Sequence, residues 1–419
     1  MNAYMDKVYY QERVIEVAWR GGSVETNVAS SFVKGVRLFR DGCWGIASSQ
    51  GENININELK ERALKNLRLC LQVSRHNIGE LAEARTYKGK VILGKESDLD
   101  KLYALIENIV SRTYNVSEVI VTNYSFCRAI EGEGEYCEEH KNVVELILSI
   151  RIKGSYREGV GSTSIAFTGN VGDLSRKKVE ELIRIAEDRA SANARAKILD
   201  PFSRGKWTII LDPECSGTLF HELAHLLEAD SSKHFKPGTR ITTMDLDLYD
   251  DPLYPWSPSI RFFDDERVST FKRSLVEDGV VIDLLHTRYT ASFYEDARPG
   301  SSRGLFHVPK AMHTTLVVKP GDWRFSEIIE EAKKALLVSG VIKAELYEGI
   351  ISIIPEAAWI IEEGELKRPV VVRYVKIPLV SVLSKISAMS RDMRLRYSYE
   401  KGHLVAEVSP YVRLEGYVE

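Results

Sequence analysis

The chain has 419 residues, of which 44% are hydrophobic and 28% charged, and its formal net charge is -3. This length is enough for two or three domains with a large buried core. The near-neutral charge offers no electrostatic case for nucleic-acid binding, and no apolar run is long enough to span a membrane. The N-terminus lacks the apolar core of a signal peptide. We therefore expect a cytoplasmic protein whose five scattered cysteines are reduced.

The N-terminal half is predicted to combine strands and helices, because apolar residues alternate with polar ones in some segments and recur every three or four residues in others. The predicted strands lie within 12–50 and at Glu118–Phe126 and Val143–Ile152, and the predicted helices lie at 57–74, 99–110 and 175–199. The acidic run Glu131–Glu135 is interpreted as a solvated loop. Gly159 and Gly161 follow a strand, but the third glycine of a dinucleotide-binding fingerprint is missing, so we expect no nucleotide site.

The chain changes character after residue 200. A short apolar strand, Trp207–Leu211, leads into a helix with Asp212 as its N-cap and Pro213 at its first position. The later part is predicted to be mainly strands, with hairpin turns at Glu277–Gly279 and Glu362–Glu365 and helices at Ser326–Leu337 and Leu379–Met389. The fold class is therefore predicted as α+β, with a mixed α/β N-terminal domain (1–200) and a β-rich C-terminal domain (201–419) that carries the helix capped by Asp212.

The motif His221-Glu222-Leu223-Ala224-His225 gives the main functional prediction. Histidines four residues apart on a helix face the same side and can bind one Zn²⁺. Glu222 is then predicted to act as general base on the metal-bound water. The opposite side of the helix is apolar and should face a core, as shown by Leu219, Leu223, Leu226 and Leu227.

Segments along nearly the whole chain resemble the TldD/PmbA family, and specifically its TldD branch. Phe220–Asp230 resembles the zinc helix of that family. Weaker matches follow in the family's order at Gly35–Arg37, Asp41–Ser48, Phe263–Glu266, Glu277–Val280, His286–Ala291, Pro320–Asp322 and Pro355–Ala357. The resemblance implies a two-domain zinc peptidase that cleaves unfolded peptides inside an enclosed cavity. It also implies a dimer, either a homodimer or a heterodimer with a zinc-free TldE-type chain, in which this chain is the catalytic member.

Two features depart from the family pattern. Many relatives have one more residue between the two histidines, but the shorter spacing found here suits a regular helix. The family's third zinc ligand is a cysteine near the C-terminus, whereas no cysteine lies beyond Cys215 in this chain. His403 occupies about the right stretch and is the leading candidate for the third ligand. Glu400 and Glu228 remain alternatives, and Glu228 could instead hold an imidazole as a hydrogen-bond acceptor.

The sequence therefore predicts a zinc metallopeptidase that acts on unfolded or short peptides. Its oxyanion-stabilising group is unassigned among His286, Arg288, Tyr289, Arg303, His307 and His313. The strand-like segment around Val317 and Val318 could bind an extended peptide by β-addition. The alternative function is that of a scaffold or binding subunit, whose zinc is structural or lost and which supports a catalytic partner.

Overall fold

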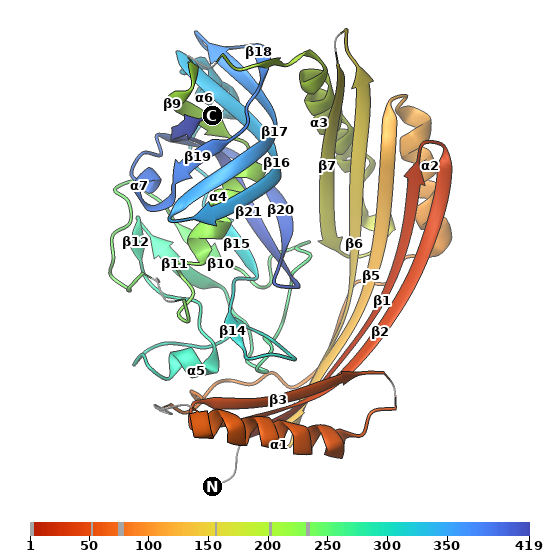
Figure 1. The fold of residues 1–419 in the computed structure, drawn as a ribbon, viewed down its shortest axis with the longest axis vertical. Helices are drawn as coiled ribbons and strands as arrows, with labels where there is room; N and C mark the ends of the chain where they lie inside the picture. Colours follow the sequence, from red (N-terminus) through yellow and green to blue (C-terminus); the bar gives the residue numbers. More distant parts are fainter. Residues whose placement is uncertain (1–3, 52, 74–78, 156, 201–202, 232–234) are drawn as a thin grey trace.

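A computed structural model describes residues 4–51, 53–73, 79–155, 157–200, 203–231 and 235–419. Two large sheets lie side by side in it, one from each half of the chain (Figure 1). The α+β class is confirmed, with a mixed N-terminal part and a strand-rich C-terminal part. The boundary at residue 200 remains a prediction, and the short strand β8 (Lys197–Ile198) already pairs with the C-terminal sheet.

The N-terminal sheet consists of long antiparallel strands and one short parallel strand. They are β1 (Tyr4–Arg20), β2 (Ser23–Arg40), β3 (Cys43–Gln50), β4 (Gly89–Leu93), β5 (Val116–Gly132), β6 (Glu135–Lys153) and β7 (Glu158–Thr168). Their order is β3-β2-β1-β5-β6-β4, and β7 also pairs with β6. The helices of this half are α1 (Ile56–Val73), α2 (Leu99–Arg112), the 3₁₀ turn η1 (Val171–Asp173) and α3 (Arg176–Arg195).

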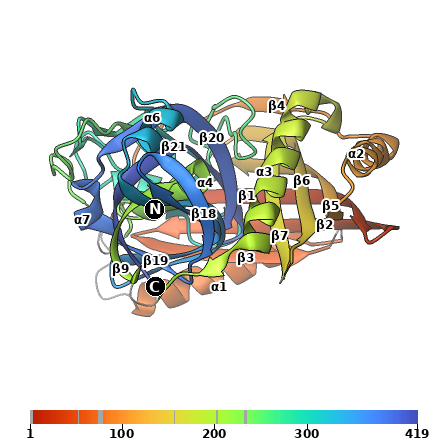
Figure 2. The ribbon, with the colours of Figure 1, turned by 90° about the horizontal axis from the view of Figure 1, so that it is seen from above.

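Apolar side chains of α2 and α3 pack on the branched residues of β5 and β6 to form the core of this half. Helix α3 lies between β7 and the C-terminal strands, as Figure 2 shows from above. Gly159 and Gly161 of β7 lie against the backbone of α3, where an added Cβ would meet the carbonyl oxygens of Ala190 and Ala186. These glycines therefore allow a close contact between helix and strand.

The acidic run is exposed at Glu133 and Gly134, as predicted, but its ends belong to strands β5 and β6, so the turn is a tight hairpin; Arg267 pairs with both Glu133 (3.2 Å) and Glu135 (3.5 Å). One prediction for the N-terminal half is wrong. The cysteines are not all reduced, because Cys43 and Cys70 form a disulfide. Helix α1 packs back onto β3 and brings together two cysteines 27 residues apart. Such bonds are typical of oxidising compartments, although intracellular proteins of hyperthermophiles also contain them.

The C-terminal half is built on a 12-stranded mixed sheet. Besides β8 its strands are β9 (Gly205–Leu211), β10 (Leu248–Asp250), β11 (Arg273–Glu277), β12 (Val280–Val281), β15 (Thr315–Val318), β16 (Lys334–Tyr347), β17 (Ile350–Glu362), β18 (Glu365–Val371), β19 (Val375–Pro378), β20 (Ala388–Glu400) and β21 (His403–Val418). A separate small pair is formed by β13 (Ser302–Arg303) and β14 (Lys310–Ala311). Five strands, β21, β9, β16, β17 and β19, pair in sequence into a closed ring.

The helices of this half are short: α4 (Pro213–Ala224), α5 (Arg288–Ala291), α6 (Phe325–Glu330) and α7 (Leu379–Leu383). The helices predicted at 326–337 and 379–389 are therefore too long, since β16 begins at Lys334 and β20 at Ala388. Leu336 and Leu337 are buried against different clusters on the two faces of β16. A strand buried on both faces has no alternating pattern, so its sequence resembles a helix. Over the described residues, none of the helices combines the length and apolarity needed to cross a bilayer.

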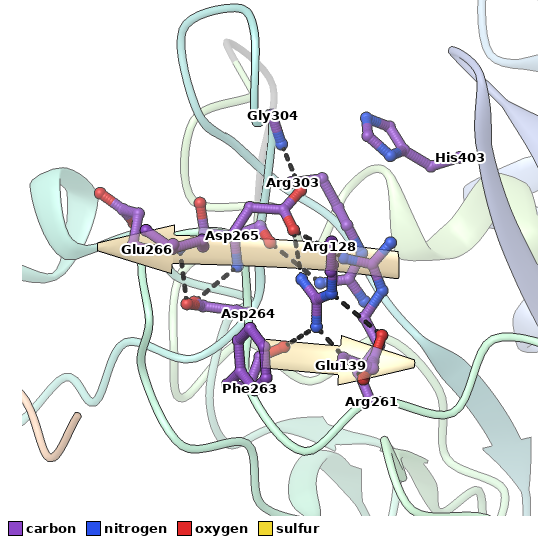
Figure 3. A network of polar contacts seen from close by, with 12 residues as sticks. Arg128, Glu139, Arg261, Phe263, Asp264, Asp265, Glu266, Arg303, Gly304 and His403 are labelled. Carbon is purple, nitrogen blue, oxygen red and sulfur yellow. Dashed lines mark hydrogen bonds and ion pairs between the residues drawn. The ribbon is translucent and has the colours of Figure 1, made fainter. Parts of the chain in front are cut away.

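A buried polar network joins the two halves (Figure 3). Arg37 of β2, fully buried, donates to Asp6 (2.8 Å) and to the carbonyl oxygens of Asp265 (2.7 Å) and Gly304 (3.0 Å). Arg128 of β5 donates to Glu139 (2.9 Å) and to the Asp265 carboxylate (2.5 Å). The family-like segments Gly35–Arg37 and Phe263–Glu266 thus meet at this contact between the halves.

Candidate metal centre

Helix α4 begins as its sequence predicts but ends at Ala224, so His225 is its C-cap and Leu226 and Leu227 follow it, contrary to the prediction that the helix includes them. The Asp212 carboxylate accepts hydrogen bonds from the amides of Glu214 (3.1 Å) and Cys215 (2.9 Å), which caps the helix behind the proline at its first position. Leu219, Leu223 and Leu227 are fully buried in the C-terminal core. The apolar face of α4 therefore anchors the helix and leaves the histidine face free for a site.

Arg189 of α3 holds the start of this helix from the neighbouring half. Its guanidinium lies 3.2 Å from Asp212, 2.6 Å from Glu214 and 3.0 Å from Glu356, and its side chain is almost completely buried. Glu356 belongs to the family-like segment Pro355–Ala357. This contact fixes the position of α4 relative to β17.

His221 of α4 and His225, the C-cap of that helix, gather with Glu400 at the end of β20. One ligand atom from each of these three residues lies within 4.8 Å of the other two. His221 Nε2 is 3.8 Å from Glu400 Oε2, and the two imidazole rings are 5.1 Å apart and nearly perpendicular. Two imidazoles and one carboxylate are a ligand set that catalytic zinc uses.

The other nitrogen of each imidazole is held by a carboxylate. His221 Nδ1 lies 2.7 Å from Glu407 Oε1, and His225 Nδ1 lies 2.9 Å from Glu228 Oε1. A carboxylate on Nδ1 fixes the ring orientation and leaves Nε2 for a metal. The residues present therefore fit a zinc ion, with Glu228 as a hydrogen-bond acceptor behind His225.

Glu407 of β21 was not predicted from the sequence as a site residue, yet it contacts His221 at this site. It is fully buried and accepts hydrogen bonds from Arg396 (2.9 Å) and His313 (3.1 Å) in addition to its contact with His221. Burial opposes its ionisation, but Arg396 and the histidines hold the pKa of Glu407 well below its usual range. The one feature of the sequence that could have indicated Glu407 is that it is a charged residue within the otherwise apolar segment Val405–Val408.

His403 does not join this group. It lies opposite Glu400 in the β20–β21 hairpin, but its Nε2 is 3.4 Å from that of His307. Burial lowers the pKa of His403 to about 4, and Figure 3 shows the ring beside Asp265 and Arg303. The structure therefore brings Glu400, rather than the leading sequence candidate, to the two histidines.

The six residues considered for the oxyanion are also dispersed. Among them His313 lies beside His221, with the two ring centroids 5.1 Å apart. It is fully buried, and burial lowers its pKa to about 4. Arg303 belongs to the buried network, and His307 pairs with His403. His286, Arg288 and Tyr289 lie in and next to α5, where Arg288 donates to the Ala82 carbonyl (2.9 Å).

A cavity of about 460 Å³ opens beside His221. His221, Glu222 and Glu400 line it, together with Val341–Ala344 of β16 and Arg394–Tyr399 of β20. Glu145 of β6 and Thr163 and Ser164 of β7 contribute from the N-terminal half. Glu222 therefore faces the same space as the metal-binding group, and both halves of the chain enclose it.

Two histidines four residues apart with a carboxylate behind each imidazole, next to a cavity lined by His221 and Glu222, are typical of a metal-dependent hydrolase. Residues 204–418 match the model of the PmbA/TldA metallopeptidase C-terminal domain, and residues 8–67 match domain 1 of the same family. The chain belongs to the PmbA/TldD metallopeptidase family.

Curated relatives carry matching names. A metalloprotease of Methanocaldococcus jannaschii is 25% identical over 421 residues, which cover 91% of this chain and 88% of that one. A zinc metalloprotease TldD homolog of Saccharolobus solfataricus is 25% identical over 270 residues, covering 61% and 58%. The solved structure of TldE from Thermococcus kodakarensis has a TM-score of 0.80 at 18% identity and covers 99% of this chain and 96% of that one, which shows a shared fold.

Proposed function

We propose that this protein is a zinc-dependent peptidase that hydrolyses unfolded or short peptides. The observation that carries the proposal is the gathering of His221, His225 and Glu400 at the wall of a cavity that His221, Glu400 and Glu222 line. Among the residues that the structure describes, the group has three protein donors, which leaves one position for water and supports a catalytic over a structural site. The alternative, a scaffold subunit, would instead have a filled tetrahedral site or no zinc.

Each residue has a defined part in the proposed reaction. His221, His225 and Glu400 would hold the zinc, which when bound supplies a Lewis acid and lowers the pKa of water. Glu222 takes a proton from the attacking water and returns it to the amine of the leaving peptide. Glu407, held by Arg396 and His313, keeps the His221 ring in the orientation that the site requires.

An exposed strand edge in the cavity supports a peptide substrate. Strand β16 pairs with β9 over Leu336–Val338, and its following residues Val341–Ala344 line the cavity beyond that pairing. An extended peptide can bind such an edge through its main chain, with little sequence preference. Val317 and Val318, the segment favoured from sequence, cannot do so because β15 is enclosed between β10 and β21.

Glu400 and His403 allow a matched test of the third ligand, since they face each other across one hairpin. We expect Glu400→Gln to weaken zinc binding by at least about tenfold, because two histidines alone hold zinc weakly. We expect His403→Ala to bind zinc as the wild type does. Competition with a zinc chelator measures both affinities. Weakened zinc binding in His403→Ala together with normal binding in Glu400→Gln would show that His403, and not Glu400, is the third zinc ligand.

The oligomeric state gives a second test. We propose a dimer, either of two copies or with a TldE-type chain. The terminal strand β3 of the N-terminal sheet pairs on one side only over the described part of the chain, and dimers commonly cover such edges. Sedimentation at micromolar concentration should show a dimer of this chain, or a mixed dimer after addition of a TldE-type chain. A monomer under both conditions contradicts the proposal.

The cytoplasmic location remains a prediction.

A further inference from the structure

A second group of metal-binding side chains lies on the N-terminal sheet, outside the site already described. Cys127 of β5 lies directly opposite His140 of β6, and Glu138 is two residues from His140 on the same face of its strand. One ligand atom from each residue lies within 4.8 Å of the other two. Arg128 and Glu139, the alternating neighbours, point instead toward the network of Figure 3. The group is thus on the sheet face turned away from that network.

The donor atoms converge on one imidazole nitrogen. His140 Nε2 is 3.6 Å from Cys127 Sγ and is also in hydrogen-bond contact with Glu138 Oε1. Typical Zn–S and Zn–N bonds of about 2.3 and 2.0–2.1 Å at a tetrahedral centre imply a sulfur–nitrogen separation of about 3.5 Å. The sulfur and nitrogen are therefore already spaced like two ligands of one zinc ion. A catalytic triad of cysteine, histidine and carboxylate fits this group less well. In such a triad the cysteine contacts one ring nitrogen of the histidine and the carboxylate contacts the other, whereas Cys127 and Glu138 both contact Nε2 of His140.

We propose that Cys127, Glu138 and His140 form a second binding site for a divalent transition metal such as Zn²⁺. Thiolate, imidazole and carboxylate together suit such metals better than Mg²⁺ or Ca²⁺. On binding, the Cys127 thiol gives its proton to solvent, and Glu138 turns from the imidazole to the metal. Lys90 (3.1 Å) and Tyr136 (2.7 Å) also contact the Glu138 carboxylate and can stay on it during that rotation. The His140 side chain is 39% exposed, so metal and a completing water can enter from solvent.

Cobalt titration separates this site from the α4 centre, because only the new site contains a thiolate. Cobalt bound by thiolate has a strong near-ultraviolet charge-transfer band, whereas an imidazole–carboxylate site lacks it. Metal-free protein with the Cys43–Cys70 bond intact should bind about two Co²⁺ per chain and show the band. Cys127→Ser should lose the band and one equivalent, and His140→Ala should weaken the same step.

The control variants make each outcome informative. Cys137→Ala changes a buried neighbouring cysteine and should keep the band and both equivalents. His225→Ala should lose the other equivalent and keep the band, so a failure of the proposed peptidase site would leave this result unchanged. Absence of the band in the wild type, or its persistence in Cys127→Ser, overturns the second site.

Discussion

Replacing Glu222 with glutamine is expected to reduce peptide cleavage by roughly 10²–10⁴-fold, the usual range for loss of a general acid–base group. Glutamine keeps the size and helix propensity of glutamate but cannot accept the proton of the attacking water. Zinc content and peptide affinity should be unchanged, because the proposed ligands and the β16 edge remain. The measurement is turnover of an unstructured peptide mixture, with zinc determined on the same samples.

A control variant tests whether a glutamate-to-glutamine change elsewhere in the chain also affects turnover. Glu187→Gln makes the same substitution on the exposed face of α3 and should keep wild-type turnover. A scaffold would show no cleavage in any form. Equal turnover by wild type and Glu222→Gln would indicate a contaminating peptidase and would remove the reason for assigning this activity.

The second large effect concerns stability. Asp265→Ala should lower the free energy of unfolding by about 3–5 kcal/mol, the usual loss when one partner of a buried ion pair is removed. The Asp265 carboxylate accepts from Arg128 (2.5 Å), Arg261 (2.8 Å) and the Gly304 amide (2.7 Å), and it is almost completely buried. Its loss leaves two buried guanidinium groups without this partner. Denaturant unfolding of both proteins measures the difference.

The effect should depend on pH with a definite sign. Burial opposes ionisation of Asp265, but Arg261 and Arg128 hold its pKa well below the usual 3.8. A carboxylate with a lowered folded-state pKa stabilises the protein above its unfolded pKa, and this contribution is lost as the pH falls. The difference between wild type and Asp265→Ala should be constant from about pH 5 to 8 and shrink below about pH 4. Asp296→Ala, at an exposed position, should change stability by less than about 0.5 kcal/mol. A difference that grows toward acid pH would contradict the assigned ionisation of Asp265.

Sequence alone predicted the features that depend on neighbouring residues. The cap at Asp212 and the apolar side of α4 follow from contacts within a few positions along the chain. The hairpin turns at Asp278-Gly279 and Glu363-Gly364 follow in the same way, because both residues of each turn have positive φ. The pairing of His221 and His225 on one helix face is equally local.

Only the tertiary structure decided which distant residues complete the sites. Glu400 and Glu407 reach His221 through the β20–β21 hairpin, and Glu407 is 186 positions further along the chain, while His403 of the same hairpin lies with His307. The Cys43–Cys70 bond likewise depends on how α1 packs on β3. Within a strand, neighbouring side chains point to opposite faces, so a shift of one residue moves a side chain from one site to another. Local sequence patterns set the elements, but the register and packing between elements determine which side chains meet.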